Sequence, residues 1–177
     1  MNHAMIDIET LGLGVRAPLF EIGVCIFDFE KLEIISSHQI NVDLLDVVFK
    51  TGFAPQQDTV DWWRKQTYDP TDGKNRMSLA RSLNKLDLRL AEADVKNVWG
   101  NSPSFDMVIL EQHYQAIGKK PGWSYKQELD FRTVRWVHRD LLGREMPEVA
   151  DEKVSHNAER DAQQQTETLF HMLRAMR

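Results

Sequence analysis

The sequence predicts an α/β fold in which helices cover a mixed β-sheet. Three observations support this prediction: β-branched apolar segments come first, an amphipathic helical segment follows, and short strands then alternate with helices. The first three strands have short connections, which indicate antiparallel pairing, because parallel neighbours need a long crossover. A length of 177 residues fits a single domain over 1–177 that can bury a core without disulfides or metal.

Strands are expected where apolar and β-branched residues cluster between turn residues. The first three are short and close together, and the last two stand between helices. These segments are 4–9, 19–28, 33–42, 95–100 and 124–129.

Helices are expected where apolar residues recur every three or four positions. The clearest stripe is Leu79, Leu83, Leu86 and Leu90. Ser104 is the expected N-cap of its helix. The expected helices are 59–67, 76–93, 104–117, a segment through about 142, and 157–176.

Composition excludes several classes of protein. The net charge of −5 excludes a polycationic coat for nucleic acid, but not a nucleic-acid enzyme, since metal-binding carboxylates count as negative until the metal binds. A single cysteine, Cys25, excludes an intrachain disulfide and a cysteine-rich zinc site, and its apolar neighbours predict burial. No secretory signal and no apolar run of about 18 residues is found, so we expect a cytoplasmic protein without a membrane partner.

A glycine-rich segment, Gly12 to Ala17, matches the G-x-G-x-x-A fingerprint of dinucleotide binding. That fingerprint functions only where a helix begins and its N-terminus receives the pyrophosphate. Pro18 follows at once and the next segment is a strand, so a turn between strands is expected instead. Walker A and nucleophile-elbow patterns are also missing from the sequence.

Acidic residues occur at unusual places. Asp7 and Glu9 lie on the same face of an apolar strand, where burial is costly unless a cation compensates the two charges. An edge strand with a polar face in water explains them equally well. Asp106 in the first turn of a helix suits capping as well as metal binding, and Asp161 suits a solvated helix face as well as the interior. His156, if the helix begins near Asn157, lies on the preceding turn and reaches the same pocket.

Taken together, three blocks resemble, in order, the exonuclease motifs of the DEDDh 3′–5′ exonucleases. The blocks are MIDIETLG (5–12), WGNSPSFDMVIL (99–110) and HNAERDA (156–162). The Trp62-Trp63 pair with Gln66, and Arg132-Thr133, are similar to a narrower branch that holds phage and prophage exonuclease VIII-like proteins and mycobacterial ribonuclease AS. The resemblance covers about residues 4–170 and implies a ribonuclease H-like fold. One departure is Ser102-Pro103-Ser104, where a Gly-Ala-type stretch is expected.

The resemblance implies a site and a reaction. Asp7, Glu9, Asp106 and Asp161 would hold two Mg²⁺ or Mn²⁺ ions, and His156 would be the general base for the attacking water. Phosphodiester bonds would be hydrolysed from the 3′ end of single-stranded or 3′-overhang nucleic acid, releasing nucleoside 5′-monophosphates.

Substrate contacts are expected from residues near these motifs. Thr10, Leu11 and Gly12 would lie against the terminal nucleotide, and Phe105 suits either base stacking or core packing. One of the adjacent Trp62 and Trp63 is expected in the core, and the other at the substrate groove or a second subunit. For any one basic residue a solvated surface charge is the favoured interpretation. The candidates for steering the substrate are Arg16, Lys74, Arg76, Arg132 and Arg135.

The polymer and the assembly are left open by the sequence. The phage-like wording of the motifs slightly favours DNA, whereas the ribonuclease AS side of the branch favours RNA with a 3′ overhang. A nuclease-like proofreading or binding module is a further alternative, although all four carboxylates and the histidine are present. A homodimer is compatible with the resemblance.

Overall fold

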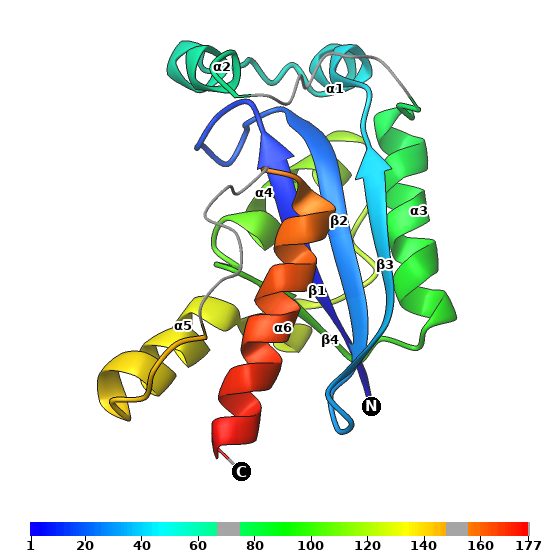
Figure 1. Cartoon of the computed structure of the whole chain (residues 1–177). Helices are drawn as coiled ribbons and strands as arrows, with labels where there is room; N and C mark the ends of the chain where they lie inside the picture. The colour runs from blue at the N-terminus through cyan, green and yellow to red at the C-terminus, as the bar shows by residue number, and fades with distance from the viewer. Residues whose placement is uncertain (67–74, 148–155, 177) are drawn as a thin grey trace.

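A computed structural model describes residues 1–66, 75–147 and 156–176 (Figure 1). Its core element is a five-stranded sheet of order β3-β2-β1-β4-β5. β2 pairs antiparallel with β1 and β3, while β4 pairs parallel with β1 and β5. The predicted mixed sheet is therefore confirmed. The strands are β1 (Asn2–Thr10), β2 (Leu19–Asp28), β3 (Glu33–Asn41), β4 (Asn97–Gly100) and β5 (Glu128–Asp130).

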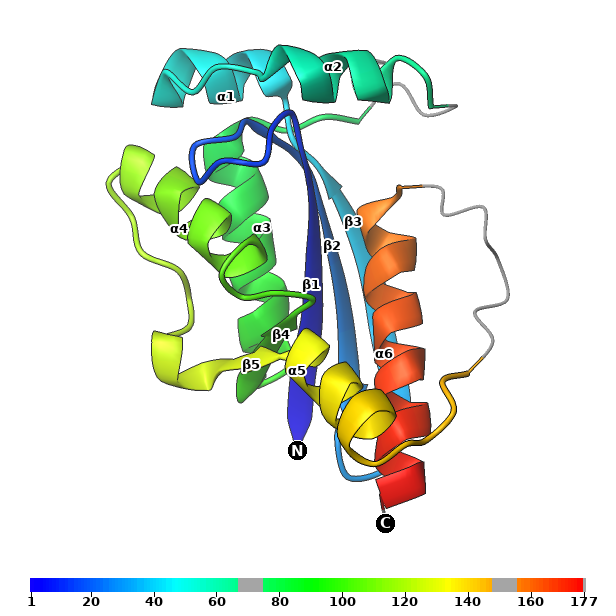
Figure 2. The same cartoon turned by 90° about the vertical axis from the view of Figure 1, so that its left-hand side faces the viewer.

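Helices cover both faces of the sheet. In Figure 2, α3 and α4 lie on one face and α6 on the other, while α1 and α2 lie across the end of the sheet where β1 finishes. A π-helical turn, η2, continues α5, and a 3-10 turn, η1, precedes β5. The helical elements are α1 (Leu44–Thr51), α2 (Gln57–Trp63), α3 (Leu79–Glu92), α4 (Asp106–Ala116), η1 (Tyr125–Gln127), α5 (Phe131–Trp136), η2 (Val137–Leu141) and α6 (Ala158–Met176).

The alternation of side chains along β1 builds a separate core on each face of the sheet. Ala4, Ile6 and Ile8 pack with the leucines of α3 and with α4. Met5 points the other way, toward the apolar residues of α5 and α6. Asp7 shares the face of Met5, as does Glu9, so both carboxylates stand on the side of α6.

Three local expectations were wrong. α1 was not predicted, because its apolar residues Leu45 and Phe49 face solvent and Val47 is its buried one, which hides the helical stripe. The strand expected over 124–129 begins only at Glu128, because the 3-10 turn η1 occupies Tyr125–Gln127, whereas the helix expected through about 142 is present as α5 continued by η2. Ser104 does not cap α4: its hydroxyl instead lies 2.8 Å from that of Ser102.

The glycine-rich segment is a turn, as predicted. The amide of Leu11 donates to the carbonyl of Pro18 at 2.9 Å, and the amide of Ala17 donates to that of Gly14 at 2.9 Å. These bonds close the connection between β1 and β2, and no helix follows it that could receive a pyrophosphate. Cys25 is buried, as expected. Within the described parts of the chain, every helix is too short or too polar to cross a lipid bilayer.

Candidate active site

The five residues singled out by the sequence line one cavity of about 330 Å³ at the end of β1. Asp7 and Glu9 come from the last half of β1, Asp106 opens α4, and Asp161 lies in the first turn of α6. His156 lies two residues before α6. Residues from opposite ends of the chain thus meet in one place. The remaining residues of the lining are Ile8, Asn101, Ser102, Phe105 and Arg132.

One side of this cavity has the ligand set of a divalent metal site. Oxygen atoms of Glu9 and Asp161 and a ring nitrogen of His156 lie within 4.8 Å of one another. Carboxylate oxygens are the ligands that Mg²⁺ and Mn²⁺ prefer. Asp7 and Asp106 add two further carboxylates to the same cavity, so the donor set fits divalent cations.

Burial opposes the ionisation of these carboxylates in the absence of a cation. It raises the pKa of Asp7, helped by the neighbouring charges of Asp106 and Asp161. It also raises the pKa of Glu9, to about 10, with Asp7 as the next cause. Burial raises the pKa of Asp106 to about 6 and that of Asp161 above its ordinary value. Four acids held this way accept positive charge, whether as protons or as metal ions.

Asp106 is fixed by the turn between β4 and α4. Its amide donates to the carbonyl of Ser102 at 3.1 Å, and its Oδ2 accepts from the amide of Ser102 at 3.2 Å. Gly100 ends β4 beside it: a Cβ there would lie 3.0 Å from the same Oδ2. The turn therefore holds the carboxylate toward the cavity although its sequence departs from the expected Gly-Ala type.

Two polar residues that the sequence did not indicate support the site from neighbouring elements. Gln165, one turn beyond Asp161 on α6, donates from Nε2 to Oδ1 of Asp7 at 2.8 Å. Glu21 of β2 is fully buried and accepts hydrogen bonds from the start of α6. Neither residue has a local sequence signal, because each finds its partner at the opposite end of the chain.

A second cavity, of about 430 Å³, adjoins the first and has mostly apolar walls. Phe105 and Glu9 line both cavities. Trp62, 40% exposed, forms part of the wall, and its ring meets that of His156 edge-on at 4.5 Å between centroids. Trp63 is buried and donates from Nε1 to the carbonyl of Thr10 at 3.1 Å. Trp62 therefore lies at the groove, whereas Trp63 is held in the core and also forms part of the lining of this cavity.

Of the three residues expected to lie against the terminal nucleotide, two line the apolar cavity and one is buried in the core. Thr10 and Gly12 line the apolar cavity. The hydroxyl of Thr10 is engaged, since it donates to the carbonyl of Gly12 at 2.7 Å. The side chain of Leu11 is buried against Phe20 and Trp63, outside the lining of that cavity. The side chain of Leu11 therefore lies in the core and not at the cavity that Thr10 and Gly12 line.

The candidate basic residues lie in different places. Arg132 lines the cavity with the carboxylates, and its charge is one of the effects that lower the pKa of Asp106 against the dominant effect of burial. Arg135 lines a neighbouring cavity that shares Asp161. Arg76 donates to the carbonyl of Val42 at 3.1 Å and is a structural residue. Lys74 lies outside the described residues.

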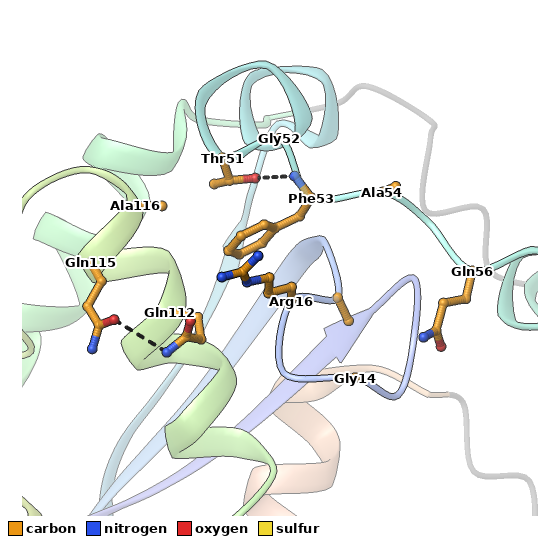
Figure 3. Close-up of a pocket in the computed structure, with 11 residues that line it drawn as sticks. Gly14, Arg16, Thr51, Gly52, Phe53, Ala54, Gln56, Gln112, Gln115 and Ala116 are labelled. Carbon is orange, nitrogen blue, oxygen red and sulfur yellow. Dashed lines mark hydrogen bonds between the residues drawn. The ribbon is translucent and has the colours of Figure 1, made fainter.

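Arg16 lines a separate cavity of about 560 Å³, which the β1–β2 connection borders together with α4 and the segment after α1. Figure 3 shows Arg16 among the residues that line this cavity, together with Phe53 and with Gln112 of α4. The carboxylates of the active site do not line this cavity. The geometry therefore leaves Arg132 and Arg135 as the basic groups nearest the cavity with the carboxylates, among the candidates that the structure describes.

Comparison with solved structures places the fold among exonucleases. The nuclease domain of 3′hExo, a DEDDh family member bound to rAMP, superposes with a TM-score of 0.65 at 14% identity, covering 98% of this chain and 92% of that one. E. coli exonuclease I in complex with an oligonucleotide superposes with a TM-score of 0.69 at 14% sequence identity. Cell-death related nuclease 4 superposes with a TM-score of 0.72 at 11% identity. This chain spans 40% and 64% of those two proteins. A search among curated proteins finds no match.

The family model defines a 3′–5′ exonuclease, and the fold is that of DEDDh exonucleases of known structure, with the predicted carboxylates and histidine together in one cavity. The model of one family, the 3′–5′ exoribonuclease Rv2179c-like domain, matches residues 2–173. The chain belongs to that family.

Proposed function

We propose that the protein is a two-metal 3′–5′ exoribonuclease that degrades single-stranded RNA or RNA 3′ overhangs to nucleoside 5′-monophosphates. The observation that carries the proposal is the convergence of Asp7, Glu9, Asp106, Asp161 and His156 on one cavity of about 330 Å³. RNA is preferred because the matching family is described by exoribonuclease activity. DNA, which the phage-like motifs slightly favour, is the alternative substrate.

The four carboxylates would hold two Mg²⁺ or Mn²⁺ ions. Bound there, the ions would activate the attacking water and stabilise the attacking and leaving oxygens of the phosphodiester. His156 would accept the proton of that water, a role that suits its place beside Glu9 and Asp161 at the cavity. Gln165, through its hydrogen bond to Oδ1 of Asp7, would keep that carboxylate directed into the cavity.

The apolar cavity would receive the 3′-terminal nucleotide. Phe105 and Trp62 offer aromatic surfaces on which a base can stack, a sequence-tolerant contact worth about 1–3 kcal/mol per base. Since Phe105 lines both cavities, a base bound beside it would place the adjoining phosphodiester next to the carboxylates. Arg132, exposed at the rim, would pair with a backbone phosphate.

The test compares RNA and DNA strands of one sequence, labelled at either end, with Mn²⁺, with Mg²⁺ and with a chelator. The proposal expects metal-dependent release of mononucleotides from the 3′-labelled RNA first, and slower degradation of DNA. Asp7→Asn is the matched inactive control, because the amide keeps the shape of the carboxylate and removes the charge. Faster degradation of DNA would replace the proposed substrate, and binding without hydrolysis would favour the nuclease-like binding module.

A further inference from the structure

The N-terminus of α6 is attached to β2 by a buried carboxylate that lies outside the set of metal ligands. Glu21 is 0% exposed and accepts from the amide of Ala158 at 2.8 Å and from Nδ2 of Asn157 at 3.1 Å. The first amides of a helix have no partner within the helix, and a negative group near them is favourable. Asn157 completes the cap, because its Oδ1 accepts from the amide of Arg160 at 3.0 Å.

A glycine two positions further along β2 brings the helix against the strand. A Cβ on Gly23 would lie 1.9 Å from the carbonyl oxygen of Ala158 and 2.4 Å from the amide nitrogen of Glu159. Residues two apart on a strand share a face, so Glu21 and Gly23 form one docking surface. In the pairing with β1, Glu21 lies opposite Glu9 and Gly23 opposite Asp7, which places this surface level with the metal ligands.

The docked end of α6 carries two of the active-site residues. His156 has a φ of 42°, a left-handed backbone conformation that residues other than glycine adopt infrequently, so its surroundings help to maintain it. Trp62 packs against the His156 ring from α2. Asp161 follows within the first turn of α6, where its amide donates to the carbonyl of Asn157 at 2.9 Å. A shift of the helix end would move both residues relative to Glu9.

We propose that Glu21 is a positioning residue for the hydrolysis, because its hydrogen bonds to Asn157 and Ala158 hold His156 and Asp161 at the cavity. The inference rests on the proposed function, in which His156 and Asp161 take part in the reaction. Glu21 does not belong to the described residues that line the cavity, so it acts through α6 and not on the substrate.

Three substitutions separate this role from general stabilisation. Glu21→Ala removes the acceptor, Glu21→Asp shortens it by one methylene, and Glu21→Gln keeps an oxygen at the same reach. The matched control is Asp43→Ala, which removes the cap of α1, where Asp43 accepts from the amides of Leu45 and Asp46. That helix carries none of the active-site residues.

The expected result is a loss of kcat by about 100-fold in Glu21→Ala, the order that a displacement of catalytic groups by about 1 Å produces. KM for the oligonucleotide should change little, Glu21→Gln should restore most of the rate, and Glu21→Asp should not. Asp43→Ala should lower Tm by about 2–8 °C and leave kcat unchanged. In a His156→Ala background, Glu21→Ala should cost much less than it does alone, because the two act as a unit.

Hydrogen exchange followed by mass spectrometry gives a readout that does not require activity. A peptide covering 156–162 should exchange faster in Glu21→Ala than in the wild type, and at the wild-type rate in Asp43→Ala. Three results would each overturn the proposal. The exchange of this peptide could be unchanged, Glu21→Ala could have the same kcat as Asp43→Ala, or Glu21→Gln could fail to restore the rate. If Glu21→Ala does not fold, equal rates for Glu21→Gln and Glu21→Asp would overturn it instead. A wild-type protein that releases no nucleotide would refute the proposed function, while the exchange experiment would still test the attachment of α6.

Discussion

Replacing Asp106 by asparagine should stabilise the metal-free protein at pH 8 while abolishing nucleotide release. The carboxyl group is 4% exposed, and burial raises its pKa from 3.8 to about 6. Below pH 3.8 the group is protonated in both the folded and the unfolded chain. Above pH 6 it is ionised in both, and the raised pKa then costs the folded state about 3 kcal/mol. Stability is therefore lost as the pH rises through the pKa of Asp106.

The asparagine side chain carries no charge, keeps an oxygen for the amide of Ser102 and relieves the repulsion with Asp7. The gain should reach about 3 kcal/mol at pH 8, which corresponds to about 6–12 °C in Tm for a chain of this length. Thermal unfolding with a chelator at pH 4 and pH 8 measures it, and the gain should vanish at pH 4. Asp43→Asn is the control, since asparagine also caps helices and Asp43 lies outside the cavity. An equal Tm gain at both pH values would refute the electrostatic reasoning.

Three further predictions concern the metal site and its support. Saturating Mn²⁺ should stabilise the wild type by about 3–4 kcal/mol, and by more at pH 8 than at pH 5. The pKa of Glu9 is raised to about 10 by burial and then by Asp7, so Glu9 must lose its proton to bind the metal. An equal increase in Tm at both pH values would contradict this prediction. His156→Ala should lower kcat by about 10²–10⁴-fold and keep most of the Mn²⁺-induced rise in Tm; loss of that rise would make His156 a metal ligand instead of a base. Gly23→Ala should lower the free energy of unfolding in urea by about 1–3 kcal/mol and reduce kcat, whereas Gly14→Ala, whose Cβ would meet the side-chain amide nitrogen of Gln56 at 3.5 Å, should stay within about 0.5 kcal/mol of wild type.

The sequence was sufficient for most of the framework. The stripe of leucines from Leu79 to Leu90 predicted α3, and the short connections of the first strands predicted their antiparallel pairing. The two-residue spacing of Asp7 and Glu9 placed both on one face of β1. Such inferences succeed because the direction of side chains repeats every two residues along a strand and every three or four residues along a helix.

The support of the site was beyond the reach of local pattern. Gln165 reaches Asp7 over 158 positions and Glu21 reaches Ala158 over 137, so no spacing in the chain reveals either contact. Leu11 is a further case, because its motif suggested contact with the substrate and packing directed it into the core.

By itself, the sequence predicted most of the elements and the acidic groups that meet at the candidate site, since periodicity and motif spacing are properties of the chain. Only the tertiary structure decided how those groups are held. The buried carboxylate of Glu21 and the bare backbone of Gly23 bring α6 against β2, and that contact depends on the packing of distant segments. Side-chain direction is set locally, whereas the partner that a buried polar group finds is set by the whole fold.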